Sequence, residues 1–301
     1  MFGECHAHVI MDGINYKAAV ALHKDGVCKA AVRAHLKEWK DAGITFVRDG
    51  GDARGASKKA KELAPEYGID YRTPVFAIHK RHHYGGIVGL PFDTWTEYEA
   101  LVLKAKEEGA DFIKIMVSGI LDFAHAGTLT EDGLDRESIR RMIGTAHDAG
   151  MAVMAHCNGN QTCYETLEAG VDSLEHGFFM EEETLHLLAE KGTAWMPTFA
   201  PVGNLLGCGR FPDEEVRKNL ERQMENVRKA MTLGAHIGLG SDAGAFVRLI
   251  GKETKCSLNI RRVVRPCLYY INSLSLTLMQ LYRKKLRCSC NFFRDFLRLI
   301  E

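Results

Sequence analysis

Short apolar runs alternate with longer amphipathic segments from residue 4 to residue 242. Runs of this kind, bounded by glycine or polar residues, are typical of buried strands. The pattern predicts eight strands, near residues 4–9, 44–48, 71–78, 111–117, 151–156, 171–175, 193–198 and 236–241.

The segments between these runs carry apolar residues at helical spacing. Thr94 and Glu97 have the spacing of a capping box, which indicates where one helix begins. Gly150, Gly192 and Gly234 directly follow other helical segments, and glycine is a common helix stop. We expect helices over residues 29–42, 56–66, 94–109, 135–149, 181–191 and 213–233.

Strands that alternate with helices predict βα units and a parallel sheet, and hence an α/β fold. Eight such units in about 240 residues match the size of a (β/α)₈ TIM barrel. A doubly wound open sheet is the rival arrangement, but no GxGxxG motif follows the first strand. Polar residues also end strands one, four, five, six and eight, and a barrel gathers those ends around one mouth. The barrel is therefore the predicted fold.

The composition is that of an ordinary globular protein, with 301 residues, 46% hydrophobic and 26% charged. The formal net charge is zero and gives no hint of nucleic acid or an anionic membrane as a partner. The partner that we expect is a small molecule. No apolar run approaches the length of a membrane span, and the first residues do not form a signal segment. Nine cysteines, an odd number, favour reduced thiols in a cytoplasm. Homo-oligomer formation stays open.

The composition changes abruptly after Gly251, and we predict a barrel over residues 1–250 and a basic tail over 251–301. Residues 252–301 contain no glycine, alanine or histidine, and they hold eleven Lys or Arg against three Asp or Glu. A separate basic module, a reading-frame slip and an aberrant fusion are all open interpretations. Cys288 and Cys290 lack the spacing of a zinc knuckle.

Two histidines, His6 and His8, lie one residue apart in the first predicted strand. Side chains alternate between the faces of a strand, so both imidazoles project from the same face. Neutral imidazole is a common zinc ligand, and two on one face can chelate one ion. The competing interpretation is a chance pairing, because the chain has 13 histidines.

Lys114 lies inside an otherwise apolar predicted strand. Lysine is rarely buried without a partner, and burial lowers the pKa of its amine. One interpretation is an ammonium paired with a nearby carboxylate. The other is a neutral amine that adds carbon dioxide, which gives a carbamate able to bridge two cations.

Three more polar residues end predicted strands, namely His156, His176 and Asp242. Histidines at the ends of two neighbouring strands indicate nitrogen ligands for a second ion, although one such histidine alone is often a satisfied core residue. Asp242 follows a glycine-rich strand. It has two interpretations: a cap of the next helix, or a metal ligand that accepts the proton of attacking water.

The order HxH, Lys, His, His and Asp on strands one, four, five, six and eight closely resembles the amidohydrolase superfamily of metal-dependent hydrolases. The resemblance extends over about residues 3–246. Residues 45–51 (TFVRDGG) and 112–116 (FIKIM) resemble the branch of imidazolonepropionase-like proteins and prolidase-like dipeptidases. Imidazolonepropionases lack the lysine of strand four, so the resemblance favours a dipeptidase of Xaa-Pro or Xaa-Arg type.

This resemblance implies a centre of two divalent cations, expected to be Zn²⁺, bridged by a carboxylated Lys114 and a hydroxide. The implied ligands are His6, His8 and Asp242 for the first ion and His156 and His176 for the second. The implied reaction is hydrolysis of an amide C–N bond in a dipeptide or an N-acyl amino acid, with Asp242 as the proton carrier. A cyclic-amide hydrolase or a deaminase of the same superfamily is the alternative.

The substrate pocket of such a barrel would come from its βα loops. Its expected lining residues are Arg48, His83, Tyr84 and His125. Arg48 suits bidentate binding of a carboxylate, and its alternative role is a structural salt bridge with Asp49 or another acid. Members of the family usually carry a small β-sandwich, which we expect this chain to lack. An inactive, truncated metal-binding fragment is therefore a further hypothesis.

Overall fold

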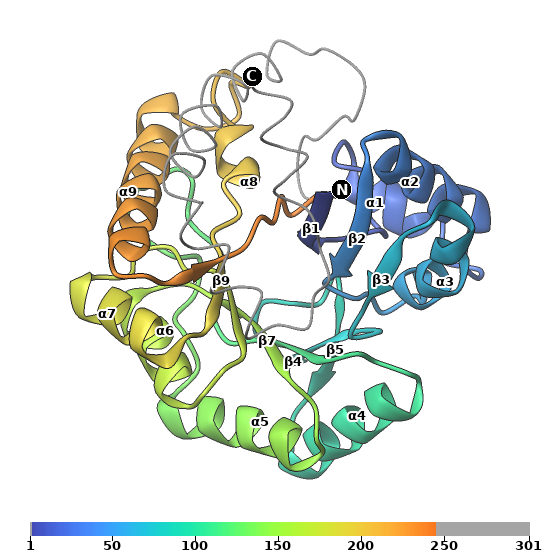
Figure 1. The fold of residues 1–301 in the computed structure, drawn as a ribbon, viewed down its shortest axis with the longest axis horizontal. Helices are drawn as coiled ribbons and strands as arrows, with labels where there is room; N and C mark the ends of the chain where they lie inside the picture. Colours follow the sequence, from blue (N-terminus) through green and yellow to red (C-terminus); the bar gives the residue numbers. More distant parts are fainter. Residues whose placement is uncertain (1, 245–301) are drawn as a thin grey trace.

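The computed structural model describes residues 2–244, in which strands occupy the middle of the molecule and helices lie outside them (Figure 1). The predicted basic tail, with Cys288 and Cys290, lies outside the described residues. The strands are β1 (Phe2–Ala7), β2 (Ile44–Asp49), β3 (Asp70–Arg72), β4 (Ala77–Lys80), β5 (Gly89–Phe92), β6 (Ile113–Met116), β7 (Val153–Cys157), β8 (Ser173–His176), β9 (Ala194–Met196) and β10 (His236–Ile237). The helices are α1 (Tyr16–Ala21), α2 (Lys29–Asp41), α3 (Ala56–Leu63), the 3₁₀ helix η1 (Ala64–Tyr67), α4 (Trp95–Glu107), α5 (Arg136–Asp148), α6 (Asn160–Glu168), α7 (Glu182–Lys191), α8 (Ala200–Gly203) and α9 (Asp213–Thr232).

The strands form two sheets, with the orders β1-β2-β3 and β10-β9-β8-β7-β6-β4-β5. All the paired strands named above run parallel. Parallel pairing with helices between successive strands confirms the predicted α/β class.

The prediction of one strand over residues 71–78 is wrong, because this stretch contributes to both sheets. Its first part belongs to β3, which pairs with β2, and its last part belongs to β4, which pairs with β6. Between them Pro74 has no backbone N–H, and Val75 has a φ of 66°, so a straight strand cannot continue. The short strand β5, which pairs with β4, was also not predicted.

The segment after β10 lies against β1, although β10 itself has only two residues. The backbone N–H of Cys5 donates to the Leu239 carbonyl at 2.8 Å, and that of Asp242 donates to the His6 carbonyl at 2.7 Å. These bonds place Asp242 beside the histidines of β1, at the opposite end of the described chain.

Apolar side chains between the larger sheet and its helices form the main core. In β6, Ile113 and Ile115 belong to this core, so alternation along the strand directs Lys114 to the other face. The predicted helix ends are confirmed for α4, where Thr94 and Glu97 form a capping box, and for α7, which Gly192 ends with a φ of 66°. No helix within residues 2–244 combines the length and the apolarity needed to cross a membrane.

Candidate metal centre

The end of β1 and the segment after β10 bring His6, His8 and Asp242 together. The Nε2 atoms of His6 and His8 lie 3.5 and 3.3 Å from Asp242 Oδ1. The three residues can each offer one ligand atom within 4.8 Å of the others. Within the described residues, His6 Nε2 and His8 Nδ1 are buried and make no hydrogen bond. A divalent cation fits this set, because imidazole and carboxylate are its usual ligands and a buried polar atom needs a partner.

Glycine at two positions allows the histidines to sit where they do. An ideal Cβ on Gly50 would lie 2.3 Å from Cε1 of His8, and one on Gly240 would lie 2.7 Å from Cβ of His6. Any larger residue at either position would therefore push a histidine out of place.

The second pair of histidines lies next to the first group. His156 of β7 and His176 of β8 have ring centroids 4.5 Å apart, and the His176 ring lies 4.9 Å from the His6 ring. Nδ1 of His176 is hydrogen-bonded to Thr198 Oγ1 at 2.6 Å, whereas Nε2 of His156 lies 3.2 Å from the Gly119 carbonyl oxygen. Each ring therefore keeps one nitrogen for a further ligand.

The electrostatics of the centre favour the metal-binding forms of these side chains. Burial, followed by the nearby Lys114, lowers the pKa of His6 and lowers that of His156 to about 3. Burial and the neighbouring histidines hold the pKa of His176 well below its usual range. Burial raises the pKa of Asp242, but its hydrogen bond with His8 and its attraction to nearby histidines outweigh that effect and lower it. Neutral imidazoles and an ionised carboxylate are the forms that bind cations.

Lys114 is enclosed as the sequence predicted, with only 1% of its surface exposed. Within residues 2–244 its Nζ makes no hydrogen bond, and no carboxylate forms an ion pair with it. Burial is the largest influence on its pKa, which falls to about 8 although Glu175 and Asp242 attract the proton. The first interpretation was an ammonium paired with a carboxylate, and the described part of the chain offers no such carboxylate.

Glu175, which the sequence analysis did not assign to the site, lies fully buried in β8 directly before His176. Its carboxylate accepts hydrogen bonds from His6 Nδ1, from Arg48 Nη2 and, at 2.6 Å, from Ser173 Oγ. Burial raises the pKa of Glu175, but Arg48 and His6 together lower it to about 2. Arg48 therefore forms the salt bridge that was the alternative to substrate binding, with Glu175 rather than with Asp49.

Glu4 is a second acidic residue that was missed. Its carboxylate accepts hydrogen bonds from the Ser241 N–H at 2.8 Å, the Ser241 hydroxyl at 2.5 Å and the His6 N–H at 3.2 Å. It thus ties β1 to the segment that carries Asp242. The signal that singled out Lys114, a charged residue in an apolar strand, applied equally to Glu4 and Glu175.

The other residues predicted for a substrate pocket lie at different depths. The Tyr84 ring is 4.8 Å from the His156 ring, and burial raises the pKa of its hydroxyl. His83 is partly buried, 3.8 Å from the carboxylate of Glu131. The His125 side chain is 75% exposed and is paired with the carboxylate three residues before it. The structure therefore brings Tyr84 to the histidines, while within residues 2–244 no hydrogen bond, ion pair or ring contact joins His125 to them.

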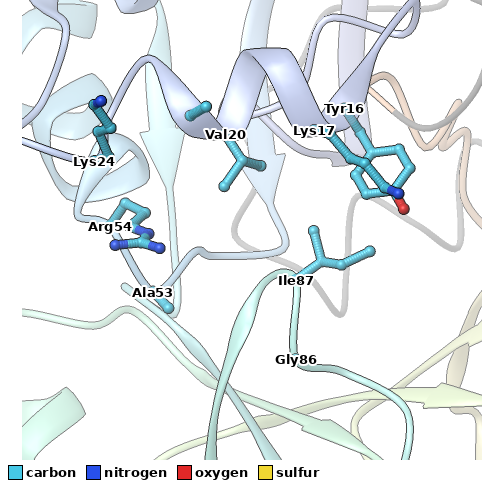
Figure 2. A pocket seen from close by; sticks show the side chains of 9 residues that line it. Tyr16, Lys17, Val20, Lys24, Ala53, Arg54, Gly86 and Ile87 are labelled. Atoms are coloured by element: carbon cyan, nitrogen blue, oxygen red, sulfur yellow. The ribbon is translucent and has the colours of Figure 1, made fainter.

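A separate hollow of about 610 Å³ opens between α1 and the loops that follow β2 and β4 (Figure 2). Lys17, Lys24 and Arg54 contribute cationic side chains to it, and Val20 and Ile87 contribute apolar ones. None of its lining residues is among the predicted site residues, so it lies outside the centre described above.

Parallel strands that end in clustered histidines and an aspartate define an α/β protein with a candidate metal centre. The amidohydrolase family model matches residues 4–284, and the chain belongs to this family. This match confirms the resemblance seen in the sequence. Members of the family generally depend on metal, in agreement with the group formed by His6, His8 and Asp242.

Part of the chain is also similar to curated relatives, and its fold is similar to that of several solved structures. Uncharacterized proteins of Mycobacterium bovis and Mycobacterium tuberculosis are 31% identical over 115 residues, which are 36% of this chain and 31% of each relative. This match thus spans about a third of the relatives' length.

Among solved structures, a Xaa-Pro dipeptidase with bound methionine has a TM-score of 0.64 at 22% identity, covering 93% of this chain and 74% of that one. A. niger ochratoxinase has a TM-score of 0.67 at 19% identity, covering 92% and 67%. A prolidase described as putative, from Bifidobacterium longum, has a TM-score of 0.63 at 21% identity, covering 89% and 64%. At these identities the likeness concerns the fold.

Proposed function

We propose that this protein is a metal-dependent hydrolase that cleaves an amide C–N bond in a dipeptide or an N-acyl amino acid. The observation that carries the proposal is the convergence of His6, His8 and Asp242, whose ligand atoms lie within 4.8 Å of one another. Lys114 is buried as well, and its Nζ makes no hydrogen bond within residues 2–244. The likeness to a Xaa-Pro dipeptidase and to a prolidase supports a dipeptide as the substrate class.

Two divalent cations, with Zn²⁺ the expected metal, would supply an activated water and polarise the amide carbonyl when bound. The first would be held by His6, His8 and Asp242, and the second by His156 and His176. A carbamate on Lys114 would supply a further carboxylate ligand. The lowered pKa of Lys114 supports this, because only a neutral amine adds carbon dioxide.

The chain's own residues would move the proton and hold the substrate. Asp242 would take a proton from the attacking water and deliver it to the leaving nitrogen, since its carboxylate is ionised and lies at the centre. Tyr84, next to His156, would contact the substrate, and His83 would lie farther out. Arg48 would hold Glu175 and β1 in place and not bind the substrate, because its guanidinium is already bound to Glu175 and to the Cys5 carbonyl.

We further propose that the two sheets together form a (β/α)₈ barrel. The backbone bonds between β1 and residues 239–243 support this at one junction. At the other, residues 73–76 run directly from β3 into β4. A barrel would gather the strand ends that carry the predicted ligands around one mouth.

The full chain, loaded with Zn²⁺, should hydrolyse members of an Xaa-amino-acid dipeptide library, with the released amino acids measured by mass spectrometry. The variant Asp242→Asn should keep its fold by circular dichroism and lose turnover by about 10²–10⁴-fold. Folded, metal-loaded protein with no turnover of any dipeptide or N-acyl amino acid would refute the proposal. Release of ammonia from heterocycles instead would indicate a deaminase.

A further inference from the structure

The buried carboxylate of Glu175 connects three strands beneath the candidate metal centre. It belongs to β8, it accepts from His6 of β1, and it is paired with Arg48 of β2. Its surface is fully enclosed. An enclosed carboxylate that binds a histidine of the centre determines which ring nitrogen of that histidine carries the proton.

In His6 the choice lies between Nδ1 and Nε2. A carboxylate can only accept, so the Nδ1 atom of a neutral His6 carries the proton and donates it to Glu175. The Nε2 atom then keeps its lone pair. This atom is buried, makes no hydrogen bond within the described residues, and lies 3.5 Å from Asp242 Oδ1. The lone pair is thus directed toward the group formed with His8 and Asp242.

Glu175 is itself held in place by two further groups. Arg48 Nη2 and Ser173 Oγ both donate to its Oε1, while His6 uses its Oε2. Arg48 is fixed in turn, because its Nε donates to the Cys5 carbonyl at 2.9 Å. Cys5 directly precedes His6, so Arg48 and Glu175 hold both the backbone and the ring of this segment.

The second pair of histidines has separate partners. His176 Nδ1 is bonded to Thr198, and His156 Nε2 lies near the Gly119 carbonyl. A change at Glu175 should therefore remove a hydrogen bond from His6 and none from the rings of these two residues.

We propose that Glu175, backed by Arg48, is a positioning residue that holds His6 with Nε2 directed at the first cation. The proposal rests on the proposed metal-dependent function. Loss of such a partner typically weakens metal affinity by about 10–100-fold. The loss should be confined to the first cation, since the second relies on other hydrogen bonds.

The test is a competition titration of the metal-free full chain with Zn²⁺ against a chromophoric chelator. In Glu175→Gln, which keeps the side-chain volume and removes the charge, the first cation should bind about 10–100-fold more weakly, with the second affinity unchanged. Thr198→Val is the matched control, because it removes the partner of His176 and should weaken the second cation instead. Ser173→Ala removes a different hydrogen bond to Glu175 and should change the first affinity by less than about threefold.

The outcomes separate this inference from the proposed function. Wild type that binds no cation refutes both. Wild type that binds two, with Glu175→Gln binding them equally well, refutes only the role of Glu175. Equal weakening of both cations, together with a lower melting temperature, would mean a structural role and also refutes it. In addition, ¹⁵N NMR of histidine-labelled wild type should find His6 protonated at Nδ1, and protonation at Nε2 would refute the inference without any variant.

Discussion

Replacing Gly50 with alanine should damage the centre through contact with His8. The added Cβ would lie 2.3 Å from His8 Cε1 and 2.9 Å from its Nδ1, whereas ordinary contact begins at 3.4 Å. The ring must therefore move by about 1 Å. It has little freedom, because its side chain is 9% exposed and its backbone N–H is bonded to the Ala243 carbonyl at 2.7 Å.

The expected size of the effect follows from this displacement. Overpacking in an enclosed site typically lowers the free energy of unfolding by about 1–3 kcal/mol. A shift of about 1 Å in a group that organises the reaction can lower the rate by about 100-fold. We therefore expect Gly50→Ala to remain folded, to bind the first cation more weakly, and to lose about 100-fold in turnover.

Three measurements on the same preparation check this expectation: urea unfolding, chelator competition for Zn²⁺, and dipeptide hydrolysis. Gly144→Ala in α5 is the matched control, because a Cβ there meets nothing within 4 Å. It should raise the free energy of unfolding by about 0.5–1 kcal/mol and leave metal binding unchanged. If Gly50→Ala bound the first cation and turned over substrate like wild type, His8 could not be a ligand in the position described.

Three further changes test the centre and the fold. Lys114→Met should raise the free energy of unfolding of the metal-free protein by about 1–3 kcal/mol, because it removes a buried amine that has no hydrogen-bond partner among the described residues. Bound metal, measured by mass spectrometry, should fall from two ions to one, and retention of two ions would contradict a bridging role. Thr94→Ala removes the capping hydrogen bond of α4 and should cost about 1 kcal/mol in urea unfolding, with turnover unchanged; a variant as stable as wild type would show that the cap contributes nothing. Removal of metal by a chelator should lower the melting temperature, and Zn²⁺ at 100 times its Kd should restore about 2.7 kcal/mol; an unchanged melting temperature would argue against a cation in the folded protein.

The local pattern of the sequence was enough to predict which residues of a strand share a face. In β6 the isoleucines on either side of Lys114 pack in the core, so alternation alone directs the lysine to the opposite face. The pattern also predicted the start of α4 at Thr94 and the end of α7 at Gly192, because capping depends on neighbouring residues only.

Strand pairing was harder to predict, because it depends on residues far away in the chain. Residues 71–78 read as one apolar strand, yet β3 pairs with β2 and β4 pairs with β6. Pro74 was the available signal for the break, since proline cannot donate to a ladder. Nothing local indicated that each half would join a different sheet.

The same distinction explains why the partners of the charged side chains could not be predicted. Lys114 and Glu175 give the same local signal, a charged residue in an apolar strand, but only Glu175 has partners within the described residues. Its partner His6 is 169 positions away in the chain, and Arg48 is 127 positions away. A strand pattern indicates that a charge is enclosed, but it does not identify the hydrogen-bond or ion-pair partners on the neighbouring strands. Within residues 2–244, His6 Nε2 and Lys114 Nζ are among the buried atoms that find no hydrogen-bond partner, and only the three-dimensional arrangement distinguishes them from the carboxylate of Glu175.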